Sequence, residues 1–573
     1  MAAPNPYESL VFPYRRAPDH DLGAPARHRV VVVGAGPVGL ALAIDLAQQG
    51  IEVLVLDNDD RLSSGSRAIC FAKRSLEIFD RLGCGERMVH KGVSWNVGRV
   101  YFRDQEIYSF NLLPEAGHER PAFINLQQYY VEGYLAERAA QLPGIEIRWK
   151  SAVTGIELHA DRARLQVDTP DGPYALDADW VAACDGSKSA LRRALGQESR
   201  GRVFHDRFLI ADIRMNAPDF PAERRFWFDP PFHPGQSVLL HKQADDVWRV
   251  DFQLGWDADP ERERRPEHIA PRVRAVLDSI GAADVQFELA WASVYTFACQ
   301  RMESFRHGRV LFAGDSAHGV SPFGARGANS GVQDADNLAW KLAAVLHGRA
   351  GPALLESYCP EREYAADQNI RHSTRATDFI TPKSDISRLF RDATLDLARH
   401  HLFARALVNS GRLSTPATLA DSPLNTPDAD DFDAGLVPGA PAADAPVLVG
   451  GAPGWWLRQL HASKFTAMLF DGAGRDDSVQ RLRAAAEGLA DLALCVVVER
   501  EGDAASATTF GAREVVDREG LLARRYAGRA GTLYLLRPDQ HVCARWRRPQ
   551  ADALRAALRR ALALPVASPV TLP

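Results

Sequence analysis

The stretch Val30-Val31-Val32-Val33-Gly34-Ala35-Gly36-Pro37-Val38-Gly39 decides the fold of this chain. The unbroken run of valines predicts a parallel strand that is covered on both faces. Residues 40–49 then show helical periodicity that ends at Gly50, and residues 51–56 form a second apolar run that ends at Asp57. This order of strand, glycine turn, helix and strand predicts a dinucleotide-binding unit.

The three glycines of the turn have different roles in such a unit. Gly34 permits the tight turn, Gly36 lets the backbone approach a pyrophosphate, and Gly39 lets the helix pack closely on the strand. We expect Pro37 and Val38 to contact the ligand as well, because they open a helix whose N-terminal amides attract phosphate. A glycine-rich turn without a ligand is the alternative interpretation.

The second strand of this unit ends in an acidic residue, Asp57, which is followed by Asn58. A carboxylate at this place accepts hydrogen bonds from ribose hydroxyls of a dinucleotide. It would also repel the 2′-phosphate of NADP, so the unit suits FAD or NAD. We include Asn58 among the expected contacts.

A second glycine-rich segment distinguishes FAD from NAD. It begins with Gly314-Asp315-Ser316-Ala317-His318 and continues with Phe323-Gly324-Ala325-Arg326-Gly327-Ala328-Asn329-Ser330-Gly331. Asp315 follows an apolar strand predicted over 309–313, so its carboxylate lies at the carboxyl end of a strand, where ligands bind in such sheets. A ribityl hydroxyl of FAD is the expected partner of Asp315.

A helix predicted over 334–347 follows the same segment. The amides of Gly327, Ala328 and Asn329 precede it and would face a ligand from the N-terminal end of a helix. Such amides stabilise the negative charge that a reduced flavin carries on its pyrimidine ring. A structural turn with a helix cap is the alternative.

Composition argues against several other classes of protein. A chain of 573 residues is long for one hydrophobic core and predicts two or three domains. Its net charge of −5 gives no support to binding of nucleic acid or of an anionic membrane. The apolar run at 30–44 is shorter than a membrane span, and residues 1–28 lack the apolar run of a signal peptide. We therefore expect a cytoplasmic protein.

The seven cysteines are scattered along the chain, and no two of them form a CxxC pair. This usage is typical of a reducing compartment with free thiols. It argues against a disulfide framework and against a structural zinc site, so we expect no bound metal.

A third motif, Cys184-Asp185-Gly186-Ser187-Lys188-Ser189-Ala190-Leu191-Arg192, lies between the two glycine-rich segments. The segments Ser66-Arg67-Ala68, Gln128 to Glu132 and Asp334-Ala335-Asp336-Asn337-Leu338-Ala339-Trp340-Lys341-Leu342 complete an ordered series over about residues 28–400. In this series the chain resembles the single-component FAD-dependent aromatic hydroxylases, a family that includes phenol hydroxylase and 3-(3-hydroxyphenyl)propionate hydroxylase.

The resemblance implies further contacts with FAD. Arg67 would contact the pyrophosphate or the flavin region, and Gln128 would contact the ribityl chain. Asp185-Gly186 corresponds to the element that the family uses for both FAD and NAD(P)H. Gly314-Asp315 would bind the ribityl chain and the pyrophosphate.

The resemblance also places the substrate beside the second glycine-rich segment. The backbone of Pro322 would approach the substrate hydroxyl, with Phe323 next to it. Arg326 departs from the family's usual glutamine, and it would either bring positive charge to the flavin and an anionic substrate or lie on the surface. His318 would be either a base for a phenol proton or a structural residue that bonds the loop backbone. The catalytic residue stays open among the Pro322 backbone, Arg326 and His318.

The expected architecture is an α/β fold with several domains. Residues 201–299 are rich in strand-like and aromatic segments, which predicts a sheet that forms one wall of the substrate pocket. In the tail, strand-like runs at 465–470, 492–498 and 532–536 alternate with helical segments, which predicts a small α/β domain. This tail resembles the thioredoxin-like domain of the phenol hydroxylase branch, but it has no CxxC. The predicted order is an N-terminal extension (1–27), a two-part Rossmann-like FAD-binding domain (28–200 and 300–405), a substrate-binding β-sheet domain (201–299), a linker (406–440) and a thioredoxin-like domain (441–573).

The family's activity implies the function. NADH or NADPH would bind transiently and reduce FAD, and O₂ would give a flavin C4a-hydroperoxide that hydroxylates a phenolic or aromatic-acid substrate in aromatic catabolism. A monooxygenase for a larger polycyclic or antibiotic-like aromatic stays open. So does a non-catalytic flavoprotein whose C-terminal domain binds a partner. The family's habit favours a homodimer.

Overall fold

The quoted stretch Val30–Gly39 lies in the middle of a largely parallel sheet in the computed structural model, which describes residues 6–7, 10–63, 68–408, 413–471, 477–499 and 512–565. Strand β1 pairs in parallel with β2 and with β11, so that Val33 lies beside Leu56 and Ala183. The four valines of β1 are buried, because helices and loops cover both faces. The sheet has the order β17 (Arg306–His307), β18 (Val310–Phe312), β11 (Tyr174–Ala183), β1 (Ala26–Val33), β2 (Val53–Leu56) and β8 (Ile145–Arg148); β10 (Ala163–Asp168) also pairs with β11, and β9 (Ala152–Leu158) pairs with β10.

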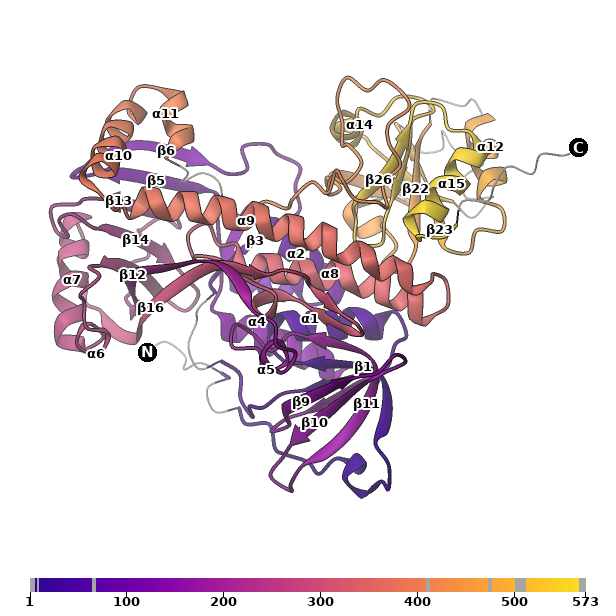
Figure 1. Cartoon of the computed structure of the whole chain (residues 1–573). Helices are drawn as coiled ribbons and strands as arrows, with labels where there is room; N and C mark the ends of the chain where they lie inside the picture. Colours follow the sequence, from indigo (N-terminus) through magenta and orange to yellow (C-terminus); the bar gives the residue numbers. More distant parts are fainter. Residues whose placement is uncertain are drawn as a thin grey trace, which may run out of the picture.

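Helices α1 and α8 pack against each other on this sheet (Figure 1). α8 runs from Gly327 to Leu346, so the prediction that this helix begins at Asp334 is wrong. It begins earlier because Gly331, without a side chain, fits against Val38 and Gly314, and because Asp334 is buried among hydrogen-bond donors. Around the sheet lie α1 (Pro37–Gln48), α2 (Lys73–Leu82), α3 (Gly85–Lys91), α4 (Gln128–Ala140), α5 (Ala190–Ala194) and a small sheet of β3 (Cys70–Ala72), β7 (Phe123–Asn125) and β4 (Val93–Trp95).

The second large sheet is antiparallel over most of its width and has two covered faces. One face packs on α7 (Pro266–Ser279), and the other packs on α9 (Tyr358–Ile380), α10 (Asp385–Ala398) and α11 (Leu402–Leu407). Its order is β19 (His318–Gly319), β16 (Glu288–Met302), β12 (Ser199–Arg214), β15 (Val247–Leu254), β14 (Ser237–Lys242), β13 (Arg224–Phe228), β5 (Val97–Phe102) and β6 (Gln105–Asn111), and α6 (Pro260–Glu263) precedes α7.

This sheet departs from the predicted boundaries at one edge. β5 and β6 come from a part of the chain that the sequence analysis assigns to the FAD-binding domain, yet β5 pairs in parallel with β13. The pairing joins segments more than a hundred residues apart, which hydrophobic periodicity within a short window does not reveal. The second large sheet is therefore built from two separate stretches of the chain.

The C-terminal body is a third α/β unit, at the upper right of Figure 1. Its predicted strands at 465–470, 492–498 and 532–536 correspond to β22, β23 and β25. The sheet has the order β21 (Ala452–Trp455), β20 (Pro446–Val449), β24 (Arg513–Val516), β23 (Leu492–Val498), β22 (Phe465–Phe470), β25 (Leu533–Leu536) and β26 (Val542–Trp546), with α12 (Asp477–Ala486), α14 (Leu521–Tyr526) and α15 (Ala551–Ala561). The α/β fold class is confirmed.

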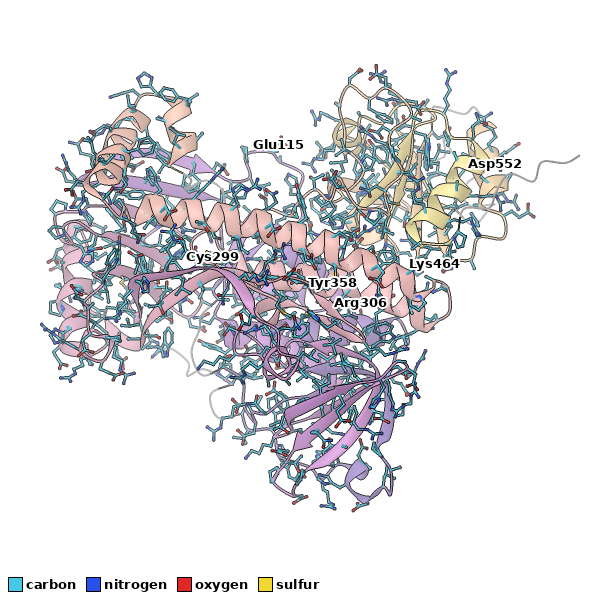
Figure 2. The ribbon with its side chains drawn as sticks, in the orientation of Figure 1. Glu115, Cys299, Arg306, Tyr358, Lys464 and Asp552 are labelled. Carbon is cyan, nitrogen blue, oxygen red and sulfur yellow. The ribbon has the colours of Figure 1, made fainter. Side chains whose placement is uncertain are left out.

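A long helix, α9, crosses the molecule from the side of the C-terminal body to the second large sheet (Figure 1). In its first turn, Tyr358, labelled in Figure 2, donates from its hydroxyl to the carbonyl oxygen of Phe312 at 2.7 Å. One turn further, Glu361 is buried between Lys341 of α8 (2.7 Å) and Arg537 of the C-terminal body (2.6 Å). Burial alone would raise the pKa of Glu361, but the two cations outweigh burial and hold it well below its usual value.

The Glu361 contacts predict a large loss of stability when that charge is removed. In Glu361→Gln, Lys341 and Arg537 keep their buried charges without their carboxylate, so we expect a loss of about 3 kcal/mol at pH 7. Because the pKa of Glu361 is lowered by folding, its contribution is fully present above pH 4.5 and is lost progressively as the pH falls from there through the lowered pKa of the folded state. Urea unfolding of both proteins at pH 7 and pH 4 measures this difference.

Glu356→Gln is the matched control, since Glu356 is 69% exposed and pairs at the surface with Arg306. We expect a loss below about 1 kcal/mol for this variant. Equal stability of the two variants at pH 7 would contradict the importance of the buried contacts.

Candidate active site

The glycines of the turn after β1 differ in whether packing within the protein or the approach of a ligand requires them. A Cβ on Gly34, which has φ +107°, would lie 2.4 Å from the carbonyl oxygen of Cys184, and one on Gly39 would lie 1.9 Å from that of Gly34. A Cβ on Gly36 would meet no atom within 4 Å. Gly34 and Gly39 are therefore required by the protein's own packing, whereas the space over Gly36 stays open to a ligand.

Asp57 lies at the carboxyl end of β2, beside this turn. Its Oδ2 accepts from the amide of Ala35 at 2.6 Å, and its Oδ1 accepts from the amide of Asp59 at 2.8 Å. Burial raises the pKa of this half-buried carboxyl above its usual value. Asn58 is exposed next to it. Pro37 opens α1, and the side chain of the following Val38 packs toward Gly314.

The segment after β18 brings a second carboxylate to the same edge of the sheet. Gly314 and Ser316 are buried, whereas Asp315 between them is exposed. The hydroxyl of Ser316 donates to the carbonyl oxygens of Ala183 and Ala313 at 2.5 and 2.8 Å, which ties this segment to β11 and to the residue after β18. Asp315 is thus displayed at the carboxyl end of the parallel sheet.

His318 is held inside the protein by Asp334. Its Nε2 lies 2.6 Å from Oδ2 of Asp334, and the same oxygen accepts from the amide of Gly314 at 2.9 Å. Arg362 of α9 donates to the other oxygen at 2.7 Å. Burial alone would raise the pKa of Asp334, but His318 and Arg362 outweigh burial and lower it. These contacts favour the structural interpretation of His318.

The first turn of α8 presents backbone amides next to Asp315. Ser330 is the first residue of the helix whose amide bonds back along it, to the carbonyl oxygen of Arg326 at 2.8 Å. The amides of Gly327, Ala328 and Asn329 precede that bond and point out of the helix end. The side chain of Asn329 accepts from the amide of Ala72 (2.8 Å) and donates to the carbonyl oxygen of Cys70 (2.9 Å), so β3 lies beside this turn.

Asp185-Gly186 and Gln128 are the next two predicted contacts with FAD. Asp185 accepts from the amide of Leu191 through Oδ2, whereas its Oδ1 is buried without a hydrogen bond from any described residue; Gly186 follows with φ +73°. Gln128 accepts from the amide of Ala68 at 3.1 Å. Arg67 lies outside the described residues.

An aromatic cavity adjoins the other side of the segment before α8. Phe323 is buried edge-on to Phe208, with ring centroids 4.8 Å apart, and Pro322 is exposed. Arg326 is 3% exposed and donates to the carbonyl oxygen of Phe323 at 2.8 Å, which excludes the surface alternative for this residue. The cavity is lined by Arg99, Phe110, Arg224, Phe226, Phe228, Phe323, Gly324, Arg326, Ala376, Ile380, Val408 and Leu413.

Several polar residues of the second large sheet that were not predicted from the sequence face this side. On β15, Trp248, Val250 and Phe252 pack toward α7, so the alternating residues Arg249 and Asp251 face the other way. On β13, Arg224 alternates with the same spacing as Phe226 and Phe228, so all three side chains lie on the face of the sheet that lines the cavity. The available signal is a charged residue alternating with apolar ones in a strand, but that pattern equally describes a strand with one face in water.

Asp251 and Tyr295 lie deep in the protein yet keep some exposed surface. Burial raises the pKa of Asp251 to about 7 and that of Tyr295 well above its usual value. Arg249 is paired elsewhere, since it donates to both oxygens of Asp212 at 2.8 Å. Trp227 and Trp248 lie in the apolar core between this sheet and α7.

The chain belongs to the FAD binding domain family, whose model matches residues 27–373. It is 31% identical over 371 residues to the 3-(3-hydroxy-phenyl)propionate/3-hydroxycinnamic acid hydroxylase of Mycolicibacterium smegmatis, covering 65% of this chain and 64% of that protein. It is 29% identical over 562 residues to the 6-methylpretetramide 4-monooxygenase of Streptomyces rimosus, covering 94% of each. The predicted resemblance to FAD-dependent aromatic hydroxylases is confirmed.

Solved structures show the same fold. The flavin-dependent monooxygenase PieE, in complex with FAD and substrate, gives a TM-score of 0.75 at 21% identity and covers 95% of this chain and all of that one. Aklavinone-11 hydroxylase, with FAD and aklavinone, gives 0.71 at 23% identity and covers 94% and 100%.

The residues of this chain fit FAD. The open space over Gly36, the unpartnered buried Oδ1 of Asp185 and the outward amides of α8 are what a dinucleotide with an electron-accepting ring requires. Among the described residues, no cluster of His, Cys, Asp or Glu is arranged to hold a metal ion. No helix in those same residues has the length and apolar character to cross a membrane.

The glycine turn predicts that two similar substitutions have different effects. Gly36→Ala adds a methyl group to open space at an ordinary φ of −74°, so we expect an unchanged melting temperature and FAD affinity lowered about tenfold. Gly39→Ala forces a clash with Gly34 and should lower the melting temperature itself. Fluorescence titration of the apoproteins with FAD and thermal unfolding measure both effects.

Gly23→Ala is the control, because a Cβ there also meets nothing within 4 Å but lies outside the turn. Full FAD affinity in Gly36→Ala would show that the ligand does not approach this turn.

The raised pKa of Asp251 predicts that the protein becomes less stable as the pH rises. Its pKa is raised by folding from 3.8 to about 7, so the folded state holds the proton more tightly and loses stability as the pH rises through this window. Asp251→Asn should therefore be more stable than the natural protein by about 2 kcal/mol at pH 8 and equally stable at pH 4. Urea unfolding at both pH values measures this, with the exposed Asp257→Asn as control; a difference that does not vary with pH would contradict it.

Proposed function

We propose that this protein is an FAD-dependent monooxygenase that uses NADH or NADPH and O₂ to hydroxylate a phenolic or aromatic-acid substrate. One observation carries the proposal: residues 322–329 have two sides. The amides of Gly327 to Asn329 emerge on the side of the dinucleotide turn, and Phe323, Gly324 and Arg326 line the aromatic cavity. A cofactor ring at the amides and an aromatic substrate in the cavity would therefore meet across a few residues.

The parallel sheet and the helix ends would hold the cofactor. Gly34, Gly36 and Gly39 with the first turn of α1 would bind the pyrophosphate, and Asp57 the ribose. Asp315 would bind the ribityl chain, and the α8 amides would stabilise negative charge on the flavin ring. Bound FAD would supply the electron transfer from NAD(P)H to O₂ and the insertion of one oxygen atom into the substrate.

The aromatic cavity would orient the substrate and exclude water. Phe226, Phe228 and Phe323 form apolar walls on which an aromatic ring packs. The Ser321 hydroxyl lies 3.0 Å from that of Thr377 on α9, which fixes the segment before α8 against the helix. This fixed wall would keep the substrate ring in one orientation toward the cofactor.

A second candidate is hydroxylation of a larger polycyclic aromatic. It is favoured by the similarity to the 6-methylpretetramide 4-monooxygenase, which extends over 94% of both chains, including the C-terminal body.

The thioredoxin-like character of that body, a homodimer and a place in the cytoplasm stay predictions.

Turnover with a substrate panel tests the proposal. The FAD-loaded protein is mixed with NADH or NADPH under ¹⁸O₂ and with simple phenols, hydroxyphenyl carboxylic acids or hydroxylated polycyclic aromatics. We expect one class to accelerate NAD(P)H oxidation and to gain one ¹⁸O atom by mass spectrometry. Absence of both effects with every compound would contradict the proposal, and the class that reacts distinguishes the two candidates.

A further inference from the structure

The aromatic cavity contains three arginines that differ in their partners. Arg99 has an ion-pair partner, because it donates to both carboxylate oxygens of Glu223 at 2.6 and 2.9 Å. Arg326 donates to the carbonyl oxygen of Phe323. Arg224 is only 8% exposed, yet its guanidinium makes neither an ion pair nor a hydrogen bond with any residue in the described ranges.

An unpaired buried guanidinium is costly. Burial lowers the pKa of Arg224, which shows that its surroundings disfavour the charge. Removing such a cation from water costs several kcal/mol unless an anion or several acceptors replace the water. The described residues give this guanidinium no acceptor, so its partner has to come from outside the protein, as water or as a bound ligand.

The groups that face Arg224 do not neutralise it. Asp251 attracts it but lies beyond ion-pair distance, and burial raises the pKa of Asp251 to about 7. Burial, with Arg224 and Arg249, holds the pKa of His241 well below its usual value, so this neighbour on β14 is neutral at pH 7. The thiol of Cys70 is also uncharged, since burial raises its pKa to about 11.

The apolar side chains around Arg224 indicate which chemical group the rest of the ligand carries. Gly98 of β5 leaves room for the ring of Phe110, whose nearest atom lies 2.2 Å from where a Cβ would be. With Phe226, Phe228 and Phe323, this ring makes an apolar enclosure that has a cation on its wall. Such a combination recognises an aromatic ring bearing a carboxylate, because a guanidinium binds both carboxylate oxygens.

We propose that Arg224 binds the carboxylate of the substrate, so that this enzyme acts on aromatic acids and discriminates against neutral phenols. Arg326 adds positive charge to the same cavity. The assignment rests on the proposed function for the meaning of the cavity, but its test measures binding and needs no turnover.

The experiment compares an acid with its neutral isostere. The FAD-loaded protein is titrated with 3-phenylpropionate and with 3-phenylpropionamide, and binding is followed by calorimetry and by the flavin absorption spectrum. We expect the acid to bind about tenfold or more tightly than the amide. In Arg224→Met the acid should no longer bind more tightly than the amide. Arg224→Lys should keep part of the difference, because a lysine retains the positive charge but cannot bind both carboxylate oxygens with a planar guanidinium.

Arg225→Met is the matched control. Arg225 is the next residue of the same strand, but it points to the opposite face, over the ring of Phe220 at 5.5 Å. Its loss should leave the preference for the acid unchanged. Retained FAD and an unchanged melting temperature show that each variant is folded.

Equal binding of acid and amide by the natural protein would overturn the proposal, and so would no binding of either. An unchanged preference in folded Arg224→Met would also overturn it. A shift of the flavin reduction potential in Arg224→Met, without loss of acid binding, would assign this cation to the reduced flavin instead. Hydroxylation of neutral phenols without acid preference would leave the proposed function standing and this inference refuted.

Discussion

The buried carboxylate of Asp334 is the contact on which the arrangement of the site depends. It accepts from the amide of Gly314, from His318 and from Arg362, and so joins the segment after β18 to α8 and α9. A charge this deep is stable only with several donors, so the three elements cannot move apart without exposing or orphaning it. Because they are held together, the Asp315 carboxylate, the first amides of α8 and the aromatic cavity occupy neighbouring places.

Buried charges in this protein fall into two groups. Glu361 with Arg537, and Arg249 with Asp212, are paired through short contacts that join different elements. Arg224 is buried without such a partner and borders the cavity. Satisfied ions hold elements together, whereas an unsatisfied ion beside a cavity indicates a ligand.

The sequence predicted the local units well and the assembly of distant ones poorly. The strand, turn and helix around Gly34 to Gly39, and the strands at 465–470 and 492–498, follow from periodicity and glycine placement. The start of α8 at Gly327 was missed because it depends on contacts of Gly331 with α1 and of Asp334 with α9, far away in the chain. Arg224 and Asp251 were missed because alternation shows that two faces differ, and only the packing of α9 to α11 shows that both are covered.

We expect FAD to lie along the edge of the parallel sheet with its ring at the start of α8. A crystal structure of the protein with FAD would show whether it does. We expect the adenosine ribose at Asp57, the pyrophosphate over Gly36, and the flavin pyrimidine ring at the amides of residues 327–329, facing the aromatic cavity. A dinucleotide bound in the opposite direction, or a flavin ring away from α8, would contradict it.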